Sequence, residues 1–150
     1  MEIVEDTLGI DLETFLARPL FCFLATASPD GPRVSPLWYL WEEGALWIAV
    51  NPETKSYPGR IEDDPRTALA VVDFDARRGL VQHVGMRGRA SLEAFDPDRT
   101  RRLFRRYLGP AERWDRRFHA VFDRSDRYRL VRFEPETVVA RDQSYAPGPP

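Results

Sequence analysis

Three short apolar runs follow one another near the amino terminus, and tight turns separate them. The first, "LFCFLATA" (20–27), is rich in strand-forming residues and leads into "SPDG", a strong turn signal. "PRVSPLWYLW" (32–41) and "ALWIAV" (45–50) follow, with "EEG" as a tight turn between them. Strands joined by such short turns pair antiparallel, so this segment predicts a meander of consecutive hairpins.

The remaining chain continues this strand pattern, with helices grouped between the strands. Four more strands are predicted, over residues 66–74, 80–94, 127–135 and 136–142. The last two are expected to meet at a turn formed by Glu134 and Pro135. Gly85 and Gly88 fall inside the strand 80–94, where glycine is typical of a bulge or a sharp bend.

Four helices are predicted from caps and apolar stripes. Asp11 and Asp96 are capping residues of two of them. Their expected ranges are 11–18, 57–65, 96–109 and 110–123. Six or seven short antiparallel strands with short flanking helices indicate an α+β, mainly β domain, built as a small closed or split barrel. One domain is expected over residues 1–150, ending in a tail (142–150) that is mobile or draped on a partner.

Composition narrows the function classes. The chain has 24 acidic and 22 basic residues and a formal net charge of −2, so nothing draws it overall to nucleic acid or a membrane. Its single cysteine, Cys22, excludes an internal disulfide and a cysteine-based metal cluster, and is expected to be a small buried hydrophobe. No leader and no apolar stretch of roughly 20 residues is visible, so a cytoplasmic protein is expected.

Lys55 is the only lysine beside 21 arginines, and it lies between Thr54 and Ser56 before a predicted helix. Hydroxyls and an ammonium at a helix start can bind an anion, because the first amides of a helix lack partners inside it. The alternative is that Thr54 or Ser56 only caps the helix and Lys55 is solvated. Arg33, after the "SPDG" turn, is a second candidate anion ligand or an ordinary surface arginine.

Four pieces of text occur in an order that is similar to a known family. They are "FLATASPDGPRVSPLWYLWEEGALWIAV", "TKSYPGRIEDDPRTALAV", "VGMRGRASL" and "RFEPETVVARD". Over about residues 12–142 the chain thereby resembles the pyridoxamine-phosphate-oxidase-like family of flavin-binding split barrels. Many members carry a Lys-x-x-Asn-like stretch ending eight residues before the proline of "DPR". Here Lys55 lies ten residues before Pro65, and Tyr57-Pro58 occupies that region.

The resemblance implies a homodimer with two flavin mononucleotide (FMN) sites at its interface. The phosphate is expected near Lys55 and Arg33, and the flavin ring along "VSPLW" (34–38), where Pro36 interrupts the strand ladder. The expected cofactor-binding residues are Arg33, Val34, Ser35, Pro36, Leu37, Trp38, Val50, Asn51, Thr54, Lys55, Ser56 and Gln82. His83 is a lesser candidate for a cofactor or substrate contact, and His119 a still weaker one.

Three functions are weighed. The first is an FMN-dependent oxidoreductase that transfers hydride to or from a small organic substrate. The second uses the deazaflavin F420 on the same fold, and the third is a flavin- or haem-binding module without turnover. Oxidation of pyridoxamine phosphate itself is not expected, because no second cluster of basic and hydroxyl residues is visible for a substrate phosphate. Dimerisation is also expected from Trp38, Tyr39, Trp41 and Trp47, which crowd two adjacent strands and need cover on both faces.

Overall fold

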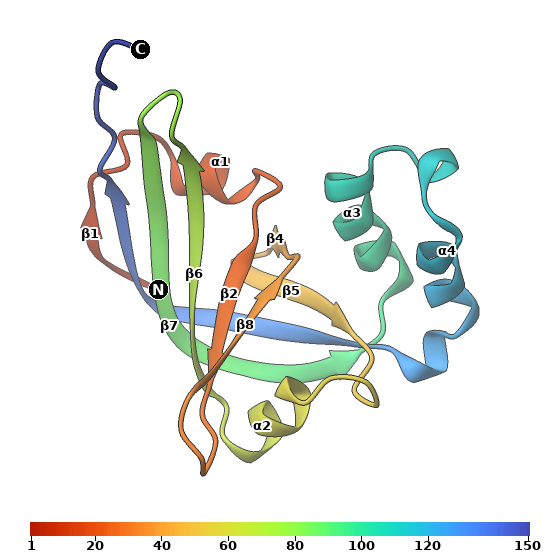
Figure 1. Cartoon of the computed structure of the whole chain (residues 1–150). Coiled ribbons are helices and arrows are strands. Elements are labelled where there is room, and N and C mark those ends of the chain that lie inside the picture. Colours follow the sequence, from red (N-terminus) through yellow and green to blue (C-terminus); the bar gives the residue numbers. More distant parts are fainter.

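A computed structural model describes all 150 residues and shows one curled, predominantly antiparallel sheet flanked by helices (Figure 1). Its strands are β1 (Glu2–Asp6), β2 (Cys22–Thr26), β3 (Arg33–Leu37), β4 (Leu40–Glu42), β5 (Ala45–Val50), β6 (Arg66–Asp75), β7 (Leu80–Ala94) and β8 (Arg129–Asp142). They are ordered β3-β2-β6-β7-β8-β5-β4, and β1 pairs with β8 in parallel. The predicted mainly β split barrel is confirmed, with β1 as an additional strand that the sequence did not predict.

The long strands β7 and β8 pair along nearly their whole length and bend together (Figure 1). Their register shifts between Arg87 and Gly88, where Gly88 lies opposite Pro135. A Cβ atom at Gly88 would lie 2.0 Å from the carbonyl oxygen of Glu134, so only glycine fits this close approach. The expected turn at Glu134 and Pro135 was wrong: a bulge absorbs the proline, which cannot donate to the ladder, and β8 continues as one strand.

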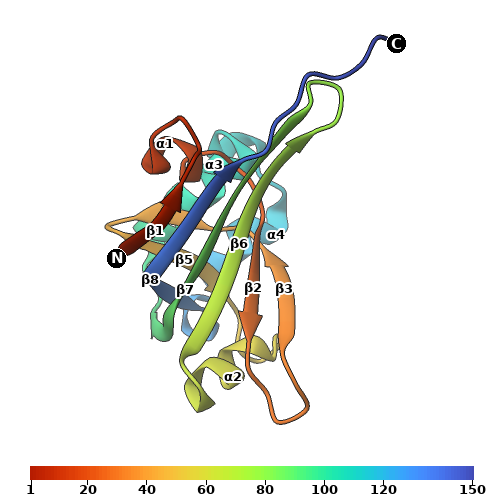
Figure 2. The same cartoon turned by 90° about the vertical axis from the view of Figure 1, so that its left-hand side faces the viewer.

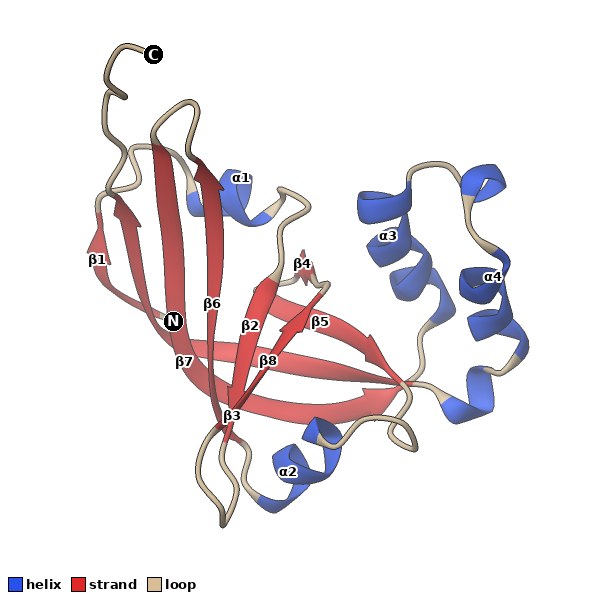
Figure 3. Cartoon of the chain, viewed as in Figure 1, coloured by secondary structure: helices blue, strands red, loops and turns tan.

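Helices α1 (Leu12–Leu16), α2 (Tyr57–Asp63), α3 (Pro97–Leu108) and α4 (Arg116–Asp123) flank the sheet, with short 3₁₀ turns at Ala111–Arg113 and Ser125–Arg127 (Figure 3). Asp11 and Asp96 accept hydrogen bonds from the first turns of α1 and α3, as predicted. The helix expected over 110–123 is interrupted at Trp114, whose indole donates to the carbonyl of Gly109 at 2.9 Å. The strand expected over 32–41 is likewise interrupted, at Trp38 and Tyr39.

Two hydrophobic clusters hold these layers together. The larger one fills the barrel and includes Phe15, Tyr39 and Phe133, each fully buried. The thiol of Cys22 lies in the same cluster, as expected, and burial raises its pKa to about 12. The second cluster packs α3 and α4 against β4, β5 and β8, with Trp47 and Phe104 among its members. No helix of the structure has the length and apolar character needed to span a membrane.

The helices α3 and α4 cover aromatic residues that were expected to need a second subunit. Trp38 stacks on Tyr107 of α3 with the ring centroids 4.6 Å apart, and Trp47 is buried beneath the guanidinium of Arg99. That argument for a dimer was therefore wrong, because the chain covers these residues itself. The tail also departs from expectation at its start, where Tyr145 donates from its backbone nitrogen to Gly79 at 2.9 Å.

Candidate functional site

Strand β3 pairs with β2 on one side only, and its other edge borders a cavity. The cavity has a volume of about 530 Å³ and lies between β3, β5 and the helices α3 and α4. It is lined by Phe21, Pro36, Leu37, Trp38, Ile48, Ala49, Lys55, Leu103, Phe104, Arg117, Phe118, Val121 and Tyr128. Such a volume and a mostly apolar lining are typical of small-molecule and cofactor sites.

Four of the predicted site residues meet in this cavity: Pro36, Leu37, Trp38 and Lys55. Pro36 is opposite Phe23 in the ladder with β2, on an edge strand, which is where a sheet tolerates proline. Lys55 is exposed and forms no ion pair with any carboxylate of the chain. The cavity thus combines a free strand edge, an indole and an uncompensated ammonium.

The wall opposite the sheet consists of aromatic rings. Phe118 of α4 lies 5.8 Å from Trp38 and 5.4 Å from Phe104, centroid to centroid. Glu42 of β4 accepts hydrogen bonds from Nη2 and Nε of Arg102, at 2.7 and 2.8 Å, which ties α3 to the sheet. These contacts hold the aromatic wall at a fixed distance from the strand edge.

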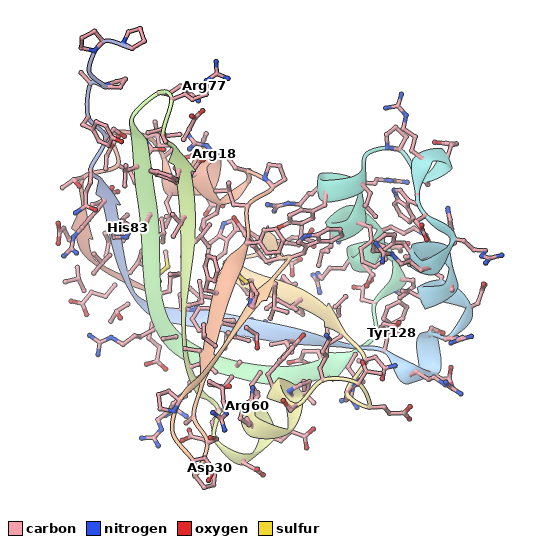
Figure 4. All side chains as sticks on the ribbon, viewed as in Figure 1. Arg18, Asp30, Arg60, Arg77, His83 and Tyr128 are labelled. Carbon is pink, nitrogen blue, oxygen red and sulfur yellow. The ribbon has the colours of Figure 1, made fainter.

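Sequence reasoning missed nine of the lining residues. Four of them, Leu103, Phe104, Phe118 and Val121, belong to the apolar stripes of the predicted helices. Arg117 adds a second cation, and Tyr128, between the 3₁₀ turn Ser125–Arg127 and β8, adds a phenol (Figure 4). The sequence placed Arg117 and Phe118 on the helix predicted over 110–123, but it did not indicate that they line a cavity.

A cluster of hydroxyls lies beside the cavity, where α2 packs against β2. Arg60 of α2 donates from Nε to the hydroxyl of Thr26 and from Nη1 to the hydroxyl of Ser56, both at 2.8 Å. Thr26 is in register with Arg33 on one side and Thr67 on the other, so these residues share one face of the sheet. Figure 4 shows Arg60 between α2 and the lower ends of β2 and β3.

The other predicted residues near α2 shape the loop that presents Lys55. The backbone carbonyl of Asn51 accepts from both the backbone nitrogen and the hydroxyl of Thr54, at 3.1 and 3.2 Å. Neither Thr54 nor Ser56 caps α2 through its side chain. Val50 is buried in the barrel core.

Within β3, the predicted residues Val34 and Ser35 lie outside the cavity lining. Val34 is 67% exposed on the outer face of the sheet, in register with Ala25. Ser35 is half-buried and opposite Leu24. The strand therefore brings its carboxyl-terminal half, and not its middle, to the cavity.

Gln82 is brought to a different place from the cavity. Its amide oxygen accepts from Arg18 at 2.8 Å and its amide nitrogen donates to Asp142 at 2.9 Å. Gln82 is paired with Asp73, at the opposite end of β6 from Thr67 and α2. Its amide is occupied in tying α1, β7 and β8 together.

The two histidines also lie away from the cavity lining. Figure 4 shows His83 on β7, far from Tyr128. His83 is in register with Arg141 of β8. The Nε2 atom of His119 lies 3.0 Å from the carbonyl oxygen of Ala111.

Comparison with known proteins agrees with this geometry. The model of a family described as pyridoxamine 5'-phosphate oxidase matches residues 9–142. The chain belongs to this family. The proposed resemblance is thereby confirmed over nearly the whole chain, whereas no curated protein matches the sequence.

Solved structures of the family fold extend over nearly the same residues. The conserved hypothetical protein Rv2991 from Mycobacterium tuberculosis has 18% identity and a TM-score of 0.71, over 99% of this chain and 98% of that chain. An F420 reductase has 24% identity and a TM-score of 0.62, over 84% and 94%. HutZ, the heme storage protein from Vibrio cholerae, has 14% identity and a TM-score of 0.66, over 89% and 93%. At these identities the similarity shows the fold alone.

Proposed function

We propose that this member of the pyridoxamine 5'-phosphate oxidase family is an FMN-dependent oxidoreductase that transfers hydride to or from a small organic substrate. The observation that carries the proposal is the cavity where the free edge of β3, at Pro36, Leu37 and Trp38, meets Lys55. Sequence reasoning assigned these four residues to the cofactor independently of their positions in space.

The residues present fit FMN in three respects. The apolar walls suit a flat isoalloxazine ring, and the free edge of β3 suits the ring's hydrogen-bonding rim, because edge strands carry unpaired backbone groups. At the other end of β3, Arg33 and Ser56 offer a cation and a hydroxyl for the phosphate. Neither Lys55 nor Arg33 is engaged by a carboxylate of the chain.

This arrangement suggests separate roles for the cofactor and for the protein. Bound FMN would supply the redox chemistry, and the protein would position it and exclude water. The rings of Phe104 and Phe118 offer an apolar surface across the cavity from β3, where a small organic substrate has room. Arg117 and Tyr128 are the polar groups of that side, and would orient a substrate oxygen or acid group.

The proposed active form is a homodimer built on the outer face of the sheet. Figure 2 views this face, with β1, β8, β7, β6, β2 and β3 side by side. Phe23, Val34, Val72 and Phe74 are 41%, 67%, 39% and 62% exposed there. An apolar area of this kind supports burial against a second copy. Sedimentation equilibrium tests it: a stable monomer at micromolar concentration would exclude a dimer built on this face.

A second candidate is an F420-dependent reductase on the same site. Arg117 favours it, because a second cation lines the cavity and the deazaflavin carries a longer acidic tail than FMN. A haem-binding role has less support from the geometry, since neither His83 nor His119 lines the cavity to serve as an axial ligand.

The absorbance spectrum of the purified protein, followed by mass spectrometry of what heat releases, tests the cofactor. We expect a yellow protein with one FMN per chain, or stoichiometric uptake of added FMN. F420 or haem in its place would support the corresponding alternative, and no uptake of FMN would overturn the proposal. Turnover is tested by mixing photoreduced holoprotein with small quinones without oxygen: reoxidation no faster than that of free FMN would leave a binding protein without enzymatic activity.

A further inference from the structure

The lining of the cavity carries positive charge and no negative charge. Lys55 and Arg117 are its only charged members, and none of the 13 lining residues is acidic. The chain as a whole has more acidic than basic residues, 24 against 22, so the lining differs from the rest of the sequence. Apolar walls weaken the screening of these cations by water, and a cleft lined by one sign of charge attracts the other. The cavity therefore favours an anionic ligand.

The polar side chains of the lining are hydrogen-bond donors without acceptors in the chain. The nearest carboxylate oxygen to Arg117, on Asp115, is 4.0 Å from its Nε, which is beyond hydrogen-bond distance. The tyrosine hydroxyls that form hydrogen bonds within the chain are those of Tyr39 and Tyr107, so the phenol of Tyr128 has no partner. A ligand with oxygen atoms would supply the missing acceptors.

Arg117 lies on the wall that faces β3 across the cavity, in the first turn of α4. Its guanidinium carbon is 4.9 Å from the centre of the Phe118 ring, and Phe118 in turn lies 5.8 Å from Trp38. Stacking on a ring occupies the flat face of a guanidinium and leaves its N–H groups free. These can bind a carboxylate through two parallel hydrogen bonds, beside an aromatic surface.

The donors around Arg117 suit a carboxylate better than a phosphate. The backbone amides of Arg117 and Phe118 are already bonded to Asp115, at 3.0 Å each. No serine, threonine, asparagine or glutamine lines the cavity. One guanidinium satisfies both oxygens of a carboxylate, whereas the third oxygen of a phosphate would find no donor beside it.

Tyr128 lies at the other end of the same wall. α4 runs along the cavity, since Phe118 and Val121 both line it, and Tyr128 follows the 3₁₀ turn after this helix. Figure 4 shows Tyr128 where the chain enters β8. At about 1.5 Å per residue, α4 extends about 9 Å beyond Arg117. A ligand with an acid group at one end and a neutral oxygen at the other can therefore meet both side chains.

We infer that the substrate of this cavity is an aromatic organic acid, whose carboxylate binds Arg117 while Tyr128 donates to an oxygen at its far end. The rings of Phe104 and Phe118 provide the surface on which a planar ring packs. That this ligand is the substrate rests on the proposed function, whereas the preference of the cavity for an organic acid does not.

Calorimetric titration with three naphthalene ligands tests this preference. Naphthoate, naphthamide and naphthyl phosphate, all substituted at the same ring carbon, differ only in the head group. We expect the wild type to bind naphthoate roughly threefold to tenfold more tightly than the neutral amide, and more tightly than the phosphate. Equal affinity for acid and amide, or tighter binding of the phosphate, would overturn the inference. If the protein takes up no FMN, the proposed function fails, and titration of the cofactor-free chain still decides the preference for an acid.

Arg117→Gln and Arg116→Gln form a matched pair of variants. Both arginines are exposed neighbours in α4, and only Arg117 lines the cavity. We expect Arg117→Gln to lower the affinity for naphthoate to near that of the amide and to leave the amide unchanged, and Arg116→Gln to alter neither. Equal losses in the two variants, or no loss in either, would overturn the assignment to Arg117. Should Arg117→Gln not fold, Arg117→Lys keeps the charge without the planar fork and is expected to lose part of the preference.

A naphthoate that carries an acetyl group on its far ring tests Tyr128. We expect the wild type to bind it more tightly than naphthoate, and Tyr128→Phe to remove this gain without changing the affinity for naphthoate itself. A gain that persists in Tyr128→Phe, or no gain in the wild type, would contradict the role of Tyr128.

The use of this acid site in turnover is tested with a naphthoquinone that carries a propanoate side chain and with its methyl ester, which has the same ring. With photoreduced holoprotein we expect a lower KM for the acid in the wild type and in Arg116→Gln, and equal KM values for acid and ester in Arg117→Gln. Equal KM values in the wild type would overturn the assignment of the acid site to the substrate, while the proposed function stands.

Discussion

The phenol oxygen of Tyr107 lies 3.0 Å from the backbone nitrogen of Tyr39 and accepts its hydrogen bond. The same hydroxyl directs its proton to the carbonyl oxygens of Leu20 and Tyr39, at 2.7 and 3.1 Å. One side chain of α3 thereby satisfies the backbone where β3 stops and β4 begins. Because Trp38 stacks on this ring, the same contact positions the indole in the cavity.

Tyr107→Phe should therefore destabilise the protein although it preserves the stacked ring. The change leaves the Tyr39 amide and the Leu20 carbonyl without their partner, and we expect a loss of about 1–3 kcal/mol in the free energy of unfolding. Urea denaturation measures it. Tyr145→Phe is the control, since Tyr145 is exposed and its hydroxyl makes no hydrogen bond, and it should be neutral. Equal stability of the two variants would mean that water replaces the Tyr107 hydroxyl without cost.

Two glycines of β7 should respond very differently to the same substitution. At Gly88 an added methyl would lie 2.0 Å from the Glu134 carbonyl, and Gly88→Ala should lose about 3 kcal/mol or more. At Gly85 nothing lies within 4 Å of an added methyl, so Gly85→Ala should change stability by less than about 0.5 kcal/mol. Thermal unfolding of the pair checks this. Similar midpoints would show that the β7–β8 bulge can rearrange.

The ion pair between β4 and α3 should make stability depend on pH. Hydrogen bonds from Arg102 and then from Arg99 hold the pKa of Glu42 below its ordinary value of 4.5, against the effect of burial. A lowered folded-state pKa contributes stability that is full above the unfolded pKa and is lost as the pH falls through the folded pKa.

Glu42→Gln should accordingly cost about 1 kcal/mol near neutral pH, and the difference from the wild type should vanish in acid. Urea denaturation between about pH 6 and about pH 3 measures both proteins. Glu112→Gln is the control, because Glu112 is exposed and forms no ion pair. The prediction fails if the penalty of Glu42→Gln is the same at both ends of this range.

Lys55 should contribute to the affinity for the proposed cofactor. Since Lys55 lines the cavity, Lys55→Met should weaken FMN and riboflavin alike, by roughly twofold to fivefold for an exposed charge. Fluorescence titration with the two ligands measures both constants. A loss confined to FMN would contradict this prediction, because it would mean that Lys55 binds the phosphate and not the part of the ligand that riboflavin shares.

The sequence predicted correctly those elements whose ends are marked by turn residues next to them. β5 and β7 have the predicted bounds because turn residues enclose each of them. β1 was missed because "EIVED" carries three acids in five residues, and only its pairing with the distant β8 makes it a strand. β8 was divided because the consequence of Pro135 depends on Gly88, which lies 47 positions earlier.

The residues of the candidate site show the same difference between what neighbouring residues reveal and what only the fold reveals. Pro36, Leu37 and Trp38 were predicted because three neighbouring residues of one strand share a location. Phe118 was not, because its position depends on how α3 and α4 fold back over the sheet. Arg60 carries no distinguishing mark in an arginine-rich text. Its distinction is the lack of a carboxylate nearby, which only the folded chain reveals.

The proline in β3 has a further consequence for how the molecule behaves in a crowded solution. A bare strand edge recruits strands of other chains as readily as it accepts a flat ligand, and unchecked it leads toward fibrous association. Pro36 has no backbone N–H, so a strand of another chain could not form a complete hydrogen-bond ladder along this edge. A small ring needs only a few hydrogen bonds, so the missing N–H does not prevent its binding. The residue at which we propose that a cofactor meets this edge is thus expected also to limit self-assembly.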